Sequence, residues 1–189
     1  IVAPITAVAC ATLPVIWGLF SGEKLSTQQV IGVFVGLFAI FLVSWTPGEQ
    51  ESIKGMLVVE ALIAGLAFGA FFIVIDGTSE TTAPWPVVGS RVFSVLAIFL
   101  FVLIGRKNIK PKGNSTPYII GAGFFDTLAN VVLLAALNRG MLSLVSVLAS
   151  FYPAVTVLLA RVFLKEMMLK SQIVGLALGL TSIALLVVS

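Results

Sequence analysis

Seven long apolar stretches constrain the fold of this chain more than any other feature. A helix needs about 20 predominantly apolar residues to cross a hydrocarbon core of roughly 30 Å. The stretches that meet this length are residues 1–20, 26–45, 55–75, 86–105, 117–137, 141–164 and 170–188. None of them alternates apolar and polar residues as a strand of a membrane barrel does. The sequence therefore predicts an all-α polytopic membrane protein in contact with the lipid bilayer.

The composition agrees and narrows the chemistry. The chain is 59% hydrophobic and 10% charged, against roughly 45–50% and about 25% in soluble domains. It has no histidine and one cysteine, Cys10, so the commonest general base and the usual zinc ligands are scarce. We also see no phosphate-binding loop and no nucleophile with a histidine partner. We expect no enzyme activity, cofactor or metal, and no nucleic-acid partner, since the basic residues lie mostly between apolar stretches.

One polar pattern occurs twice, near the two ends of the chain. The glutamate is followed by glutamine and two glycines at offsets of 6, 9 and 13 residues, first as Glu23, Gln29, Gly32 and Gly36, then as Glu166, Gln172, Gly175 and Gly179. Each copy lies in a hairpin of two apolar stretches. Three stretches separate the hairpins, and an odd number places their turns on opposite faces of the membrane. Such an inverted repeat is the construction of many secondary transporters.

The repeat divides the chain into two parts. Residues 1–46 form the last two helices of a first repeat, and residues 55–188 form a second repeat of five helices. By symmetry the first repeat should also have five helices. We therefore expect roughly 100 residues with three further helices upstream of Ile1.

Two segments resemble a known family. The run from Leu144 to Thr156, followed by Glu166 and Gln172, resembles the second half of an EamA-type permease of the drug/metabolite transporter superfamily. The preceding stretch, with Asp126 and Asn130, resembles the helix before that motif. The resemblance implies ten helices in two five-helix repeats, and it does not identify a substrate.

Asp126 is the first candidate for a role in transport. It lies near the middle of stretch 117–137, where a charged residue costs roughly 2.5–3.5 kcal/mol on insertion scales and usually faces the bundle or a water cavity. Asn130 follows one turn later on the same face. Asp126 could bind a proton or a solute, or it could only hydrogen-bond a neighbouring helix. Arg91 could pair with Asp126, but we favour an arginine that extends to the interface or pairs at the membrane edge.

The stretch 141–164 supplies a second group of candidates. One helical face carries Ser143, Ser146, Ser150 and Pro153. Pro153 cannot donate to the carbonyl of Ala149. This face could line a solute path, or it could serve only for close helix packing. Tyr152 and Trp17 could form aromatic walls of such a path, or they could face lipid.

Glycines four residues apart are interpreted as packing positions rather than sites. Small residues let the backbones of membrane helices approach closely, and the pairs are Gly32 and Gly36, Gly65 and Gly69, and Gly175 and Gly179. We interpret Glu23 and Glu166 in the same structural sense, as turn and cap residues at the membrane surface.

Together these features predict a multi-pass protein of the plasma membrane, with a homodimer allowed. Its function would be the transport of a small organic metabolite by alternating access, driven by a gradient. The alternative is a non-transporting membrane subunit, or a carrier of lipid-linked intermediates, that uses the same packing positions without a wet cavity.

Overall fold

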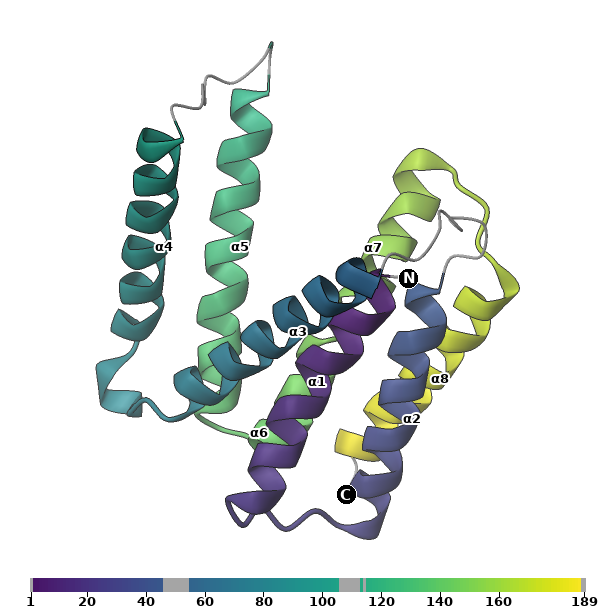
Figure 1. Cartoon of the computed structure of the whole chain (residues 1–189). Helices are drawn as coiled ribbons and strands as arrows, with labels where there is room; N and C mark the ends of the chain where they lie inside the picture. The colour runs from purple at the N-terminus through teal and green to yellow at the C-terminus, as the bar shows by residue number, and fades with distance from the viewer. Residues whose placement is uncertain (1, 46–54, 106–112, 114, 188–189) are drawn as a thin grey trace. The chain divides into compact units, whose positions relative to one another are not determined.

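The computed structural model describes residues 2–45, 55–105, 113 and 115–187 of the 189-residue chain. Every regular element among these residues is helical, and seven helical segments are long and apolar enough to cross a membrane. The chain forms two compact units, one of Ile1–Val74 with Gly140–Ser189 and one of Ile75–Arg139. Figure 1 shows the helices of both units. The predicted all-α membrane architecture is confirmed.

Six of the predicted stretches form continuous helices with ends within one residue of expectation. They are α1 (Val2–Phe20), α2 (Thr27–Ser44), α3 (Gly55–Asp76), α4 (Trp85–Ile104), α5 (Thr116–Leu137) and α8 (Lys170–Val187). A short 3-10 turn, η1 (Glu80–Thr82), lies between α3 and α4. The boundaries follow from the sequence because each apolar run ends at polar or breaking residues that cannot remain in hydrocarbon.

The sixth stretch is not one regular helix. It divides into α6 (Leu142–Ala149), α7 (Tyr152–Leu159) and the π-helical turn η2 (Ala160–Leu164). The break precedes Pro153, which cannot donate an N–H group to the carbonyl four residues earlier. At the break the N–H of Phe151 donates instead to the carbonyl of Leu148, at 3.2 Å.

The two hairpins of the first unit turn at opposite ends of that unit. The turn between α1 and α2 lies at the lower end of Figure 1, whereas the connection from η2 to α8 lies at the upper end. Lys165 ends η2 with a left-handed backbone, at φ 57°. Within the first unit, the helices therefore have the opposed directions that an inverted arrangement of the hairpins requires.

Helices α2 and α8 pack as an antiparallel pair, which we call the α2–α8 seam. Gly32 lies against Leu186 near one end of the seam, and Gly175 lies against Val43 near the other. Gly36 lies against Ser182 between them. The seam joins the hydrophobic core of the first unit, which includes Ala7, Ala11, Ile40, Val147 and Phe151.

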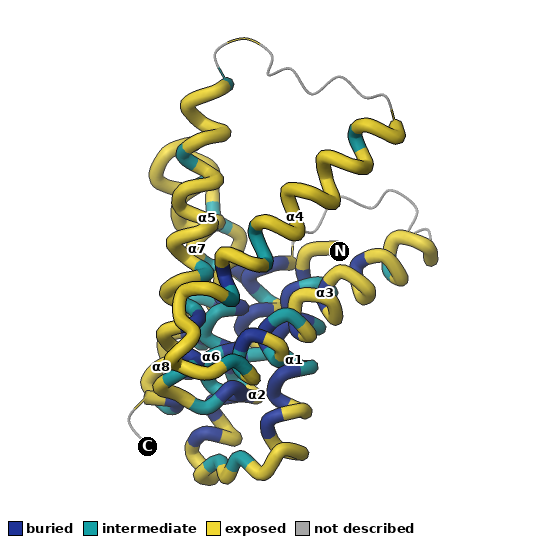
Figure 2. The backbone as a smooth tube through the Cα atoms, turned by 90° about the vertical axis from the view of Figure 1, so that its left-hand side faces the viewer, coloured by how far each residue is buried: buried dark blue, intermediate teal, exposed yellow. Residues whose placement is uncertain are grey.

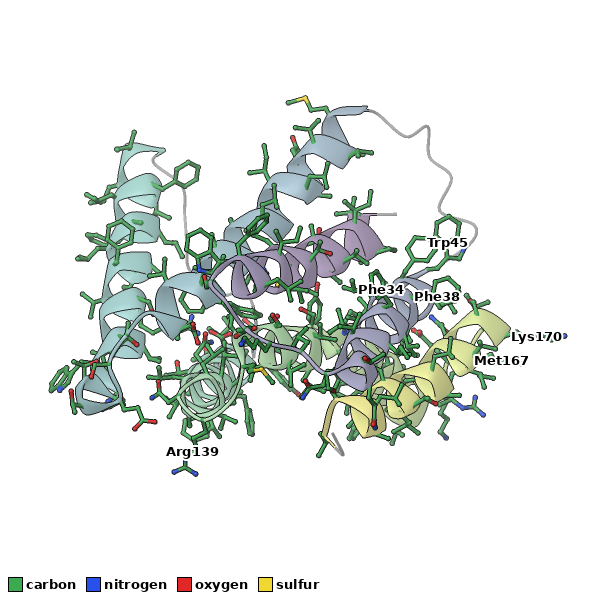
Figure 3. The ribbon with its side chains drawn as sticks, turned by 90° about the horizontal axis from the view of Figure 1, so that it is seen from below. Phe34, Phe38, Trp45, Arg139, Met167 and Lys170 are labelled. Carbon is green, nitrogen blue, oxygen red and sulfur yellow. The ribbon has the colours of Figure 1, made fainter. Side chains whose placement is uncertain are left out.

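The outer faces of the helices are apolar. Buried residues in Figure 2 gather where α1, α2 and α6 meet, while much of each helix surface is exposed. Phe34, Phe38 and Trp45 lie along α2 in Figure 3, with exposed fractions of 68%, 56% and 37%. Exposed apolar side chains in such number are typical of helices surrounded by lipid rather than water.

Candidate solute pathway

In the second unit, the candidate group on α4 and α5 is an ion pair. Arg91 Nη2 lies 2.6 Å from Asp126 Oδ2. The same nitrogen donates to the Asp126 backbone carbonyl at 3.3 Å, and Asn130 Nδ2 donates to that carbonyl at 2.8 Å. The Asp126 side chain is 60% exposed and that of Arg91 is 35% exposed. The Asp126 carboxylate is thus paired across two helices while one side of it remains open.

The interpretation that we favoured for Arg91 is therefore wrong. Arg91 does not only extend toward the interface; it pairs with Asp126 on the neighbouring helix. The physical reason is that a charge in a membrane segment is costly, and an opposite charge 2.6 Å away offsets part of that cost. The position of Arg91 in the sequence could not decide this, because a pair with Asp126 requires α4 and α5 to be neighbours.

In the first unit, the serine face of α6 is closed by packing. Ser146 is 0% exposed and Ser150 is 1% exposed. The Ser146 hydroxyl donates to the carbonyl of Ser143 at 3.0 Å, and Ser150 lies beside the Cys10 thiol of α1. Pro153 is buried as well. Helix α6 packs against α1, and since these residues are buried they do not line an open channel in this conformation.

The two aromatic candidates are more exposed than the serine face of α6. Trp17 on α1 is 53% exposed, and Tyr152 at the start of α7 is 49% exposed. About half of each side chain is exposed, which suits contact with lipid or with another segment. The structure thus assigns Arg91, Asp126 and Asn130 to the second unit, and Ser146, Ser150, Tyr152, Pro153 and Trp17 to the first.

Glu23 makes a contact whose partner the sequence did not identify. Its Oε1 accepts from the N–H of Leu142 at 2.6 Å, and its Oε2 accepts from the N–H of Ser143 at 3.1 Å. The Ser143 hydroxyl also donates to Oε2. A helix begins with backbone N–H groups that have no partner within the helix, so Glu23 caps α6. Glu23 is a cap, as expected, but for a helix that begins 119 residues later.

Glu166, the repeat counterpart of Glu23, has different surroundings. It is exposed, and its backbone carbonyl accepts from Arg161 Nη1 at 3.1 Å. It lines a small hollow of about 170 Å³ together with Arg161, Met167 and Gln172. Among the described residues, no backbone N–H group donates to its carboxylate. Figure 3 shows Lys170 at the N-terminal end of α8 and Met167 just before that helix begins.

The glutamine of the repeated motif has the same role in both copies. Gln29 Oε1 accepts from the N–H of Ser26 at 2.9 Å, and Gln172 Oε1 accepts from the N–H of Leu169 at 2.9 Å. Each glutamine thereby satisfies a donor at the N-terminal end of its own helix. The repeated sequence pattern thus corresponds to a repeated local structure.

The glycines of the motif lie where helices approach each other closely. A methyl group added at Gly175 would lie 2.9 Å from the Val43 nitrogen and 3.0 Å from the Ala39 carbonyl oxygen. One added at Gly179 would lie 2.8 Å from the Phe151 ring. Gly65 and Gly69 of α3 lie against the backbone of α1 in the same way.

Sequence reasoning missed one buried hydroxyl of the α2–α8 seam. Ser182 is 0% exposed, and its Oγ donates to the carbonyl of Gly32 at 2.7 Å. Its position three residues after Gly179 places it on the glycine face of α8, and that spacing is the signal that could have found it. Within the described ranges, no cluster of three or more histidine, cysteine, aspartate or glutamate side chains could hold a metal ion.

Comparison with known proteins agrees with this architecture. Residues 54–188 match the EamA-like transporter family. An uncharacterized protein of Methanocaldococcus jannaschii is 30% identical over 141 residues, which cover 75% of this chain and 98% of that protein. No solved structure matches the chain. The chain is an integral, multi-pass membrane protein that belongs to the EamA-like transporter family.

Proposed function

We propose that the protein is a secondary transporter that moves a small organic solute across the plasma membrane by alternating access. The observation that carries this proposal is the self-complementary α2–α8 seam. Gly32 contacts Leu186 and Gly175 contacts Val43, and in both contacts each residue lies 143 positions from its counterpart in the other. The two halves of the seam are therefore related by a twofold operation that reverses helix direction.

Such a relation supports transport because it allows two conformations of similar energy. In inverted-repeat transporters, the repeats exchange conformations and open a site near the midplane first to one side and then to the other. In this proposal residues 1–46 end the first repeat and residues 55–188 form the second.

Asp126 is the proposed coupling residue. Its carboxylate pairs with Arg91 and is 60% exposed, so the other side chains of the second unit leave one side of it uncovered. Membrane-embedded carboxylates of this kind serve as proton relays in transporters. The sequence shows no phosphate-binding loop, and we propose that an ion or solute gradient drives the transport.

Flux measurements with the full-length protein test this function. In liposomes, the protein should show saturable uptake or release of at least one solute from a panel of amino acids, amines and sugars. Asp126→Asn should change the pH dependence of that flux, and Gly121→Ala on the same helix should not, because a methyl group at Gly121 meets no atom within 4 Å. Wild-type flux with an unchanged pH profile in Asp126→Asn would remove Asp126 from the coupling role.

One observation favours a second function, that of a non-transporting membrane subunit. The hydroxyl face expected to border a path is closed, with Ser143, Ser146 and Ser150 at 0–1% exposure. A protein that only assembles with partners would keep this face dry in every state. The rate at which a water-soluble thiol reagent modifies Cys10, which lies beside Ser150, distinguishes the two functions. Alternating access would expose the α6 face and Cys10 to water in one state, whereas a permanent packing interface would keep them dry.

A further inference from the structure

A single carboxylate joins the two hairpin regions of the first unit at one membrane face. Glu23, in the turn between α1 and α2, accepts two backbone N–H groups and one hydroxyl from the start of α6. Hydrogen bonds from a helix N-terminus to a carboxylate are charge-assisted, and the helix dipole strengthens them. This contact is therefore stronger than the apolar contacts around it.

The surrounding residues leave no room for a looser arrangement. A methyl group at Gly18 would collide with the Glu23 carboxylate and the Ser143 hydroxyl. The Ser143 hydroxyl also lies 3.4 Å from the carbonyl of Val15, so α1 and α6 touch directly behind the carboxylate. Farther along α1, Cys10 is 4% exposed and lies beside Ser150 of the same α6 region. The interface between α1 and α6 is thus sealed from the Glu23 end to Cys10.

We propose that Glu23 is a positioning residue that holds the solute pathway closed at this face and must release α6 before the pathway opens there. This inference rests on the proposed transport function. In it, α1 and α6 separate at the Glu23 end when the protein changes conformation, and the serine face of α6 becomes wet. Glu23 does not bind the solute; it sets the population of the closed state through its bonds to Leu142 and Ser143.

Glu166 provides a matched control within the same motif. It has the same side chain at the equivalent position of the other hairpin, but it is exposed. Among the residues that the structure describes, no backbone N–H group donates to the Glu166 carboxylate, and the contact that Glu166 makes is through its backbone carbonyl. A change at Glu166 therefore removes the same charge without removing a contact to α6.

The single cysteine of this chain is a natural reporter for the test. The full-length protein, with any cysteine outside residues 1–189 changed to serine, is prepared in membrane vesicles of both orientations. A charged, membrane-impermeant methanethiosulfonate reagent is added, and the rate of Cys10 modification is measured by mass spectrometry. A Cys10→Ser variant gives the background.

The expected result is a side-specific change in rate. Glu23→Gln and Glu23→Ala should raise the Cys10 rate from the Glu23 side about tenfold, as expected when a strong closed-state contact is lost. Ser143→Ala should raise it less, because both backbone donors remain. Glu166→Gln should leave the Glu23-side rate at the wild-type value.

Several outcomes would overturn the role of Glu23. One is an unchanged Cys10 rate in Glu23 variants that elute as folded protein and keep the wild-type melting temperature within a few degrees. Another is an equal rise from both sides, which indicates general loosening. Solute flux is measured separately: a wild-type protein without flux overturns the proposed function, whereas normal wild-type flux with unchanged labelling overturns only the closure by Glu23.

Discussion

At the scale of single residues, the ion pair between Arg91 and Asp126 is the clearest departure from an apolar helix pair. Its two side chains lie 2.6 Å apart on α4 and α5. A charged side chain in a membrane segment raises the free energy of the folded protein, and the attraction between the two partners offsets part of that cost. Removing both partners should therefore destabilise the protein less than the two single removals added together.

A double-mutant cycle tests this reasoning. Arg91→Ala and Asp126→Ala should each lower the melting temperature in detergent, and the double variant should lose less than the sum of the two. We expect a coupling of about 1 kcal/mol, because both side chains are partly exposed and solvent screens the pair. Strictly additive losses would show that the contact contributes nothing to stability.

At the scale of helices, the α2–α8 seam depends on the absence of side chains at its glycines. Gly32, Gly36 and Gly175 each face an atom of the opposite helix that would lie within 3.0 Å of an added methyl group. In a membrane, where association depends on packing rather than on escape from water, such close backbone contact is a main source of stability.

Substitution at Gly175 should destabilise the seam. Gly175→Ala places a methyl group against the backbone of α2, and overpacking of this kind costs typically about 1–3 kcal/mol. Gly121→Ala on α5 is the matched control, since it faces open space and gains helix propensity. Thermal unfolding in detergent should show a loss of several degrees for Gly175→Ala only. Equal melting temperatures for Gly175→Ala and the wild type would mean that α2 and α8 can move apart to accommodate the methyl group without loss of stability.

Helix positions were predictable from the sequence, but helix partners were not. The length of an apolar run determines whether a segment can span the membrane, and six helices begin and end within one residue of the prediction. The break before Pro153 was only partly anticipated, because the local hydrogen bonds that replace the lost one depend on the surrounding helices. The partners of Glu23 and Arg91 lie on other helices, and no local pattern specifies which helices become neighbours.

From the sequence, we could predict which residue types belong to the candidate site but not how they contact one another. Asp126 and Asn130 stood out because polar groups are rare in such helices, and their contacts with Arg91 and with each other are now defined. The burial of Ser146 and Ser150 could not be read from spacing, because a hydroxyl face packs against a helix as readily as it borders water.

At the scale of the whole molecule, the opposed hairpin turns make a prediction about sidedness. The turn that contains Lys24 and the turn that contains Lys165 should lie on opposite faces of the membrane. In a Cys10→Ser background, Lys24→Cys and Lys165→Cys should each react with an impermeant reagent from one side only, and the two sides should differ. Labelling of both positions from the same side would contradict the inverted arrangement and, with it, the proposed transport mechanism.

The matched contacts at the two ends of the α2–α8 seam also locate the axis that relates the two repeats. The operation that interchanges Gly32–Leu186 with Gly175–Val43 has an axis that crosses the seam midway between these contacts. Residues next to such an axis have equivalent surroundings in both repeats, so an exchange of conformations between the repeats changes their contacts least. If the repeats exchange conformations as we propose, the middle of α2 and the middle of α8 should keep their contact, and a covalent cross-link between them there should leave transport intact.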